Sequence, residues 1–233
     1  MIVVGHRGAR GHAPENTLKS FAKAIEMGCQ RVEFDIHLSA DGVPVVIHDP
    51  TLDRTTSGRG PVKGLPLVEL KKLEAGEGES IPTLAETMRF CRGKVAIQVE
   101  LKDRESPAAV AELLKSEWGA EKVIVTSLEV STLQRFAELM PEIPAGHLNR
   151  DPNHDMVAVA LQQGHRWICP RCDVVTQEWV ARAHRADLLV YVYHVNDRDM
   201  ARHIASWGVD AIGTDFPEIA THLTCRDARP HQG

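Results

Sequence analysis

The chain of 233 residues has no long apolar run. No stretch approaches the roughly 20 apolar residues that a membrane-spanning helix requires, so the sequence predicts no membrane span. Residues 1–5 show no basic region followed by an apolar run and a small-residue cleavage site, and they lead directly into His6. These two absences favour a cytoplasmic protein.

Excess positive charge and paired cysteines are also missing. The sequence has 27 Lys and Arg against 32 Asp and Glu, a formal net charge of -5, so it has no basic footprint for nucleic acid. A small-molecule substrate is favoured instead. The five cysteines are an odd number and do not suggest a disulfide framework. Cys169 and Cys172 have C-x-x-C spacing, but one such pair is half of a structural zinc site, and we interpret them as part of an exposed loop.

Short β-rich segments alternate with amphipathic segments along the chain. The eight predicted strands are Ile2–Val4, Arg31–Leu38, Val95–Leu101, Val123–Thr126, Pro144–His147, Arg166–Ile168, Leu188–His194 and Ala211–Gly213. The helices predicted from apolar residues at three- and four-residue spacing are Thr17–Met27, Leu84–Arg92, Ala108–Trp118, Ser131–Leu139, Met156–Gln163, Gln177–His184 and Asp199–Trp207.

This alternation implies parallel strands joined by right-handed crossovers. Eight such units match a small (β/α)₈ barrel, the TIM barrel, which typically takes about 250 residues. An open doubly wound sheet is the competing architecture. The segment from Asp41 to Ser80 breaks the rhythm with an extra strand, Val43–Ile47, and a glycine-rich loop, so we interpret it as an insertion after the second barrel strand. We find no repeat or linker, and the chain is expected to form one domain over residues 1–233.

Ionisable residues occur on one face of the second predicted strand. The period of two places Glu33, Asp35 and His37 together, opposite an apolar face. The outward face of a barrel strand must be apolar to pack against helices, so the charged face is expected to point into the barrel, where unpaired carboxylates are costly. A cation is therefore expected near Glu33 and Asp35.

The third predicted strand has the same arrangement and carries Glu100 and Lys102. Three carboxylates meeting at the carboxyl ends of parallel strands would form a hard oxygen site suited to Mg²⁺, Ca²⁺ or Mn²⁺. Barrel enzymes place their chemistry at that rim. The alternative is a buried ion network without metal, in which the acids pair with Lys102, Arg7 and Arg31.

Two histidines finish apolar runs, His6 after the first strand and His48 after the inserted strand. Histidine can move protons near neutral pH, and we interpret both as candidate acid–base groups. Arg7 offers a planar fork of donors suited to a phosphate oxygen. Gly8 is expected to leave room for a ligand to approach the backbone.

With these residues in place, the sequence resembles the glycerophosphodiester phosphodiesterase family. The blocks that carry the resemblance extend in order over nearly the whole chain: His6-Arg7-Gly8 with Ala13–Thr17, Val32–Asp35 with Asp41-Gly42 and Val45–Asp49, Leu52–Gly58, Glu100–Lys102 and Gly208–Pro217.

The resemblance implies a TIM barrel, a divalent metal held by Glu33, Asp35 and Glu100, catalytic histidines at 6 and 48, and a phosphate held by Arg7 and Lys102. Family members commonly carry a tryptophan in a Val-Trp-Thr-Val-Asn context that lines the substrate pocket. Here Tyr193 stands at that position, so the aromatic wall is expected to be tyrosine, and substrate preference does not follow from the resemblance.

The expected reaction is hydrolysis of a glycerophosphodiester to sn-glycerol 3-phosphate and an alcohol. One histidine would deprotonate the attacking group, either water or the neighbouring glycerol hydroxyl, and the other would protonate the departing oxygen. Three alternatives stay open. They are a lysophospholipase D on the same barrel, a non-catalytic phosphate-binding protein, and a metal-dependent aldolase or isomerase for which only fold analogy speaks.

Overall fold

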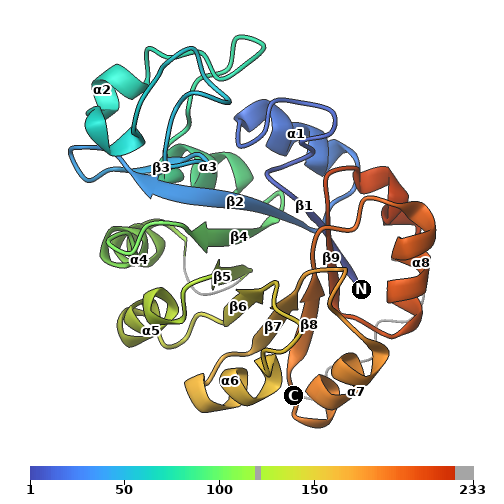
Figure 1. The fold of residues 1–233 in the computed structure, drawn as a ribbon. Helices are drawn as coiled ribbons and strands as arrows, with labels where there is room; N and C mark the ends of the chain where they lie inside the picture. The colour runs from blue at the N-terminus through green and yellow to red at the C-terminus, as the bar shows by residue number, and fades with distance from the viewer. Residues whose placement is uncertain (119–121, 224–233) are drawn as a thin grey trace.

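The computed structural model describes residues 1–118 and 122–223. In these residues eight parallel strands close into a barrel with helices around it (Figure 1). Neighbouring strands pair in the order β1-β2-β4-β5-β6-β7-β8-β9, and β1 closes the ring by pairing with both β9 and β2. The barrel strands are β1 (Ile2–Gly5), β2 (Arg31–Leu38), β4 (Ala96–Leu101), β5 (Val123–Ser127), β6 (Ala145–Asn149), β7 (Trp167–Pro170), β8 (Leu189–Val192) and β9 (Ala211–Thr214). The predicted TIM barrel is confirmed, and the open sheet is excluded.

The helices follow the predicted segments, with ends that differ by at most one residue. They are α1 (Leu18–Glu26), α3 (Leu84–Cys91), α4 (Pro107–Glu117), α5 (Val130–Leu139), α6 (Met156–Gln163), α7 (Gln177–Arg185) and α8 (Arg198–Ser206). Local chemistry sets several of these ends. The Thr17 hydroxyl accepts a hydrogen bond from the Ser20 amide at the start of α1, and Thr83 and Glu86 form a reciprocal capping box at α3. None of the helices in the described residues is long and apolar enough to cross a membrane.

Two apolar clusters between the strands and the helices, and one cluster inside the barrel, stabilise the fold. The outward residues of β2, among them Val32, Phe34 and Ile36, pack under the surrounding helices and are fully buried. A separate cluster that includes Val4, Ile124 and Leu148 fills the inside of the barrel. This division follows from the alternation of side chains along each strand.

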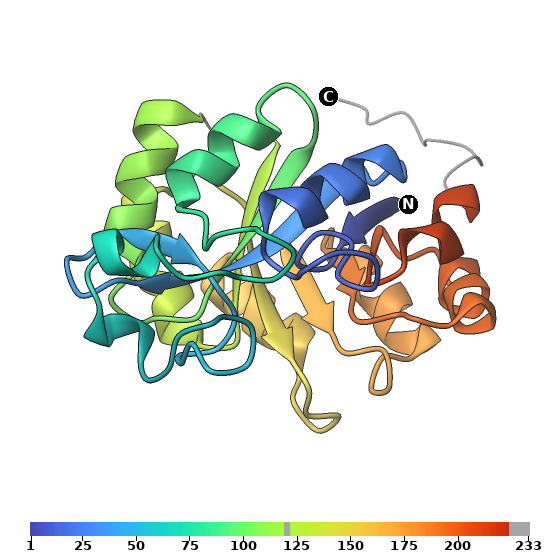
Figure 2. The ribbon, with the colours of Figure 1, turned by 90° about the horizontal axis from the view of Figure 1, so that it is seen from above.

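The insertion after β2 has its own small core. It contains β3 (Pro44–Val46), which pairs antiparallel with β2, a 3₁₀ turn (Val62–Gly64) and α2 (Leu67–Leu70). Leu52, Leu70 and Ile81 belong to its buried cluster. Figure 2 shows the loops of the insertion on the same side of the barrel as the loop that follows β6. The insertion thus lies beside the carboxyl ends of the strands.

Two expectations were wrong, and in both cases the reason is that the residue packs closely against other parts of the protein. Strand β7 continues to Pro170, so Cys169 lies within the barrel and is fully buried, and the exposed-loop interpretation of this cysteine fails. Gly8 does not make room for a ligand. A Cβ at Gly8, whose φ is +83°, would lie 2.4 Å from Ser20 Oγ, so glycine is required for α1 to pack against this turn.

Candidate active site

Three carboxylates from two adjacent barrel strands meet inside the barrel. Glu33 and Asp35 alternate along β2, and Glu100 on β4 stands in register with Asp35. One carboxylate oxygen from each of the three lies within 4.8 Å of the others. All three are buried, with exposed fractions between 0% and 8%. Parallel pairing therefore does what the sequence predicted and brings Glu33 and Glu100 to one place.

Two cations contact this acidic cluster, and they leave one acid without a cationic partner. Arg7 Nε lies 3.2 Å from Asp35 Oδ2, and Lys102 Nζ lies 3.2 Å from Asp35 Oδ1 and also pairs with Glu100. Glu33 Oε2 accepts a hydrogen bond from the Arg7 backbone amide at 3.0 Å, while Glu33 Oε1 has no hydrogen-bond partner within the described chain. Arg31, which the metal-free alternative included, instead places its guanidinium 5.2 Å from the centre of the Trp167 ring.

The charge states of the acids follow from this uneven pairing. Burial raises the pKa of Glu33 well above its usual value, and Asp35 and Glu100 act in the same direction. Burial also raises the pKa of Glu100 to about 7, against the opposing effect of Lys102. Asp35 is equally buried, but Lys102 and Arg7 outweigh that effect and hold its pKa below the usual range. Arg7 and Lys102 compensate Asp35 well, whereas Glu33 still lacks positive charge.

A hard dication fits this donor set. Oxygen ligands from carboxylates are what Mg²⁺, Ca²⁺ and Mn²⁺ prefer. The unpartnered Oε1 of Glu33 and the mutual repulsion of three clustered acids are the features that a bound dication would relieve. The carboxylates of Glu33, Asp35 and Glu100 therefore have the chemistry that a hard dication requires.

His6 lies at the end of β1 and is held on two sides. Its Nδ1 is 2.6 Å from Asp215 Oδ1, and its ring stacks on His194 with 3.5 Å between ring centroids. Asp215 in turn accepts from the Asn196 amide at 2.7 Å and pairs with Arg10 at 3.0 Å. Burial lowers the pKa of His6 to about 4, although the hydrogen bond that Asp215 accepts from the ring acts in the opposite direction. The imidazole is thus neutral at neutral pH.

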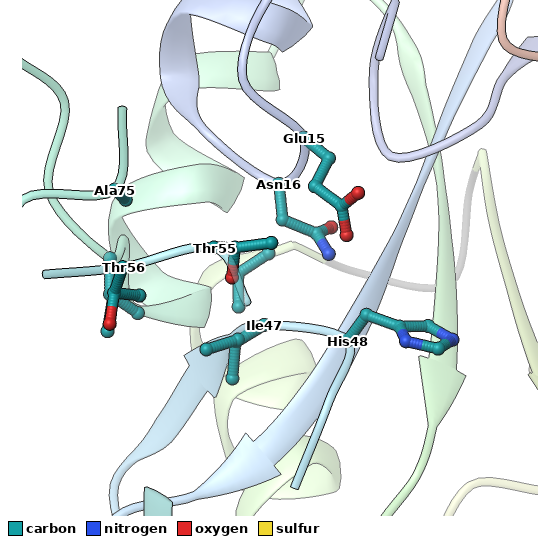
Figure 3. Close-up of a pocket in the computed structure, with 9 residues that line it drawn as sticks. Glu15, Asn16, Ile47, His48, Thr55, Thr56 and Ala75 are labelled. Atoms are coloured by element: carbon teal, nitrogen blue, oxygen red, sulfur yellow. The ribbon is translucent and has the colours of Figure 1, made fainter. Parts of the chain in front are cut away.

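His48 follows β3 in the insertion and repeats this pairing in a more open place. Its Nδ1 lies 2.6 Å from Asp49 Oδ1, and its side chain is 27% exposed. Partial burial lowers the pKa of His48, while Asp35 acts in the opposite direction. In Figure 3 the carboxylate of Glu15 and the amide of Asn16 extend toward the side of the pocket where the His48 ring lies.

Comparison with known proteins identifies the family to which this chain belongs. The sequence profile of the Glycerophosphoryl diester phosphodiesterase family matches residues 6–219. The chain belongs to this family. A glycerophosphodiester phosphodiesterase of Caldanaerobacter subterraneus subsp. tengcongensis is 32% identical over 95% of this chain and 97% of that protein.

Solved structures agree with the family assignment. A phosphodiesterase of Oleispira antarctica, solved in complex with the product sn-glycerol-3-phosphate, superposes with a TM-score of 0.91 at 31% identity over 95% of this chain and 96% of that one. A glycerophosphodiester phosphodiesterase of Agrobacterium tumefaciens gives a TM-score of 0.84 at 30% identity, over 95% and 99% of the two chains.

The position of the family tryptophan is filled here by a nearly buried ring. Tyr193 is 3% exposed, stacks with Tyr191 at 6.0 Å between centroids, and donates from its hydroxyl to the Asn149 carbonyl at 3.4 Å. The ring therefore packs mainly inside the barrel. His194, the next residue, covers His6. The substrate contact expected of Tyr193 stays a prediction.

Several residues of the family blocks have a structural role that we did not assign from sequence. Asp215 and Asp49 each bind one histidine, and Glu15 binds Arg7 at 2.7 Å. Asn16 donates to Asp35 Oδ2 at 2.9 Å. All four residues lie in the sequence blocks that carry the family resemblance. Their position in those blocks was the sequence signal that could have pointed to a role in the site.

Proposed function

We propose that the protein hydrolyses glycerophosphodiesters to sn-glycerol 3-phosphate and an alcohol, with a divalent metal ion held by Glu33, Asp35 and Glu100. The observation that carries the proposal is the meeting of three buried carboxylates with Arg7 and Lys102 at one barrel rim, in a chain of this family. The product-bound relative from Oleispira antarctica supports the same product.

The side chains divide the work by their chemistry. A dication held by the acids would supply Lewis-acid polarisation of a phosphate oxygen. Arg7 and Lys102 would stabilise the negative charge that develops on the phosphoryl group. Both are already oriented by acids, Arg7 by Glu15 and Lys102 by Glu100. Their donors are therefore fixed before a substrate arrives.

Proton transfer falls to His6 and His48. Each has its Nδ1 on a carboxylate, which leaves Nε2 for the reaction. One imidazole accepts a proton from the attacking water or glycerol hydroxyl, and the other, protonated at Nε2, donates that proton to the departing alcohol oxygen. Where the hydroxyl attacks, water then opens the cyclic phosphate to give sn-glycerol 3-phosphate. This division needs one ring beside the attacking oxygen and the other beside the departing oxygen, on opposite sides of the phosphorus. The two rings come from separate segments, the end of β1 and the insertion.

The test is a panel of glycerophosphodiesters with coupled detection of sn-glycerol 3-phosphate, run with Mg²⁺, Ca²⁺ and Mn²⁺ separately. We expect product release that chelation abolishes and one of the ions restores. Full activity after exhaustive chelation would refute the metal, and no release with any diester and ion would refute the reaction. Faster hydrolysis of lysophosphatidylcholine than of glycerophosphocholine would favour the lysophospholipase D alternative.

A further inference from the structure

A continuous chain of ion pairs connects Arg7 to His48 at the edge of the site. Arg7 Nη1 donates to Glu15 Oε1 at 2.7 Å, and Asp49 Oδ1 lies 2.6 Å from His48 Nδ1. Arg54, in the insertion, lies between the two acids. The order of contacts is thus Arg7, Glu15, Arg54, Asp49 and His48.

Arg54 binds both acids with two contacts each. Its Nη1 and Nη2 donate to the two oxygens of Glu15 at 2.9 and 2.8 Å. Its Nε and Nη2 donate to the two oxygens of Asp49 at 2.6 and 3.0 Å. A planar guanidinium can bind two carboxylates in this way because its donors point along two edges, whereas an ammonium cannot.

The two ends of this series of ion pairs belong to different parts of the fold. Arg7 and Glu15 lie between β1 and α1, while Asp49 and Arg54 lie in the insertion. The segments also face each other across the pocket in Figure 3, which Glu15, His48 and Thr55 help to line. A shift of the insertion relative to the barrel would move His48 but leave Arg7 in place. A link between them therefore fixes a distance that the barrel itself does not set.

The exposure of Arg54 argues against a role in stability alone. Its side chain is 46% exposed, and exposed ion pairs contribute little to folding. The acids it binds are better shielded, with 14% exposure for Glu15 and 23% for Asp49. Hydrogen bonds from Arg54 and the nearby Arg7 lower the pKa of Glu15 to about 2 although burial opposes them. The hydrogen bond from Arg54 also lowers the pKa of Asp49, so both acids stay charged and the link persists at neutral pH.

We propose that Arg54 is a positioning residue that holds His48 at a fixed place relative to Arg7 by binding Asp49 and Glu15 together. The proposal rests on the proposed function, because it assumes that Arg7 and His48 act on the same phosphodiester. It adds a residue whose hydrogen bonds go to Glu15 and Asp49 rather than to the acids Glu33, Asp35 and Glu100.

The first experiment is the variant Arg54→Gln, measured for kcat, KM and melting temperature on the best glycerophosphodiester of the panel. We expect kcat/KM to fall roughly 10- to 100-fold, mainly through kcat, since misplacement by about 1 Å costs that much. The melting temperature should change by only a few degrees. Arg54→Lys should recover part of the loss, because lysine restores the charge but not the double bidentate contact.

Arg59→Gln is the matched control. Arg59 lies in the same insertion, its side chain is 89% exposed, and its contact with Asp53 is 3.9 Å. It should keep wild-type kcat and KM. A loss equal to that of Arg54→Gln would show that any charge removed from this loop lowers activity, and it would overturn the proposal.

A double variant tests the linkage itself. If Arg54 acts through Glu15, then Glu15→Gln combined with Arg54→Gln should cost less than the product of the two single effects. Independent effects, or an Arg54→Gln protein that melts lower while its kcat and KM stay unchanged, would overturn the proposal. Failure of the proposed function looks different, because the unmodified protein would then release no sn-glycerol 3-phosphate.

Discussion

His6 and His48 form the same local pair in two different surroundings. Each places Nδ1 2.6 Å from an aspartate oxygen. His6 stands in the barrel, with its side chain 4% exposed, and its aspartate directly follows β9 near the other end of the sequence. His48 stands in the insertion, is 27% exposed, and takes its aspartate from the next residue.

The comparison shows that the burial of an imidazole and its orientation by a carboxylate are independent of each other. Orientation of the imidazole needs only the carboxylate, and both histidines have one. Burial decides how strongly the charged form is disfavoured, and it lowers the pKa of His6 to about 4. In the barrel His6 packs against His194, whereas our proposal assigns the positioning of His48 to the ion pair between Arg54 and Asp49.

The largest expected effect comes from removing either ring. His6→Ala and His48→Ala should each lower turnover by about 10²–10⁴, the usual contribution of an acid or base. The comparison predicts different side effects, because His6 is packed against His194 and His48 is partly open. His6→Ala should therefore lower the melting temperature more than His48→Ala. Near-normal turnover in both variants would remove these residues from the mechanism.

The sequence predicted the acidic half of the site well because that half depends on regular structure. The period of two in a strand puts Glu33 beside Asp35, and parallel register puts Glu100 opposite Asp35. No further information is needed to bring these acids together. The strand ends that carry His6 and Lys102 follow from the same rules.

The partners of the histidines did not follow from periodicity. Asp215 is 209 residues from His6, and only closure of the ring between β9 and β1 brings them together. Arg54 meets Glu15 through a loop whose path is set by the small core of the insertion, not by a repeating pattern. The buried Cys169 was missed because the strand continued two residues past its predicted end.

A smaller effect is expected from the two aspartates, Asp215→Asn and Asp49→Asn. Each change keeps the shape of the side chain and removes a charged hydrogen bond to an imidazole, worth roughly 1.5–3 kcal/mol, so turnover should fall about 10- to 100-fold. Asp215 also binds Asn196 and Arg10 and is 6% exposed. Asp215→Asn should therefore lower the free energy of unfolding, measured in denaturant, more than Asp49→Asn does.

Asp187→Asn serves as the control for these two variants, since the Asp187 side chain is 89% exposed and forms an exposed ion pair with Arg166, away from both histidines. It should leave turnover and unfolding unchanged. Equal stability losses at Asp215 and Asp49 would contradict the view that the barrel histidine is held by packing and the inserted one by surface ion pairs.

His165 offers a third arrangement, burial without any carboxylate. It is 3% exposed, and neither ring nitrogen has a hydrogen-bond partner in the described structure. Burial, with a smaller effect of His147, lowers its pKa from 6.5 to about 4. Below pH 6.5 the unfolded chain therefore takes up a proton that the folded chain does not. Its contribution to stability is present above pH 6.5 and is lost as the pH falls toward 4, by at most about 3 kcal/mol.

His165→Leu removes this titration and leaves the active site untouched. The free energy of unfolding, measured in denaturant at pH 7.5 and at pH 4.5, should fall less on acidification in the variant than in the wild type. The exposed His222, replaced by Asn, controls for the loss of one histidine and should follow the wild type. Identical pH dependence in all three proteins would mean that burial alone does not keep a histidine neutral here. The low pKa of His6 would then need the charge of the neighbouring Arg7 as its cause, rather than the barrel interior.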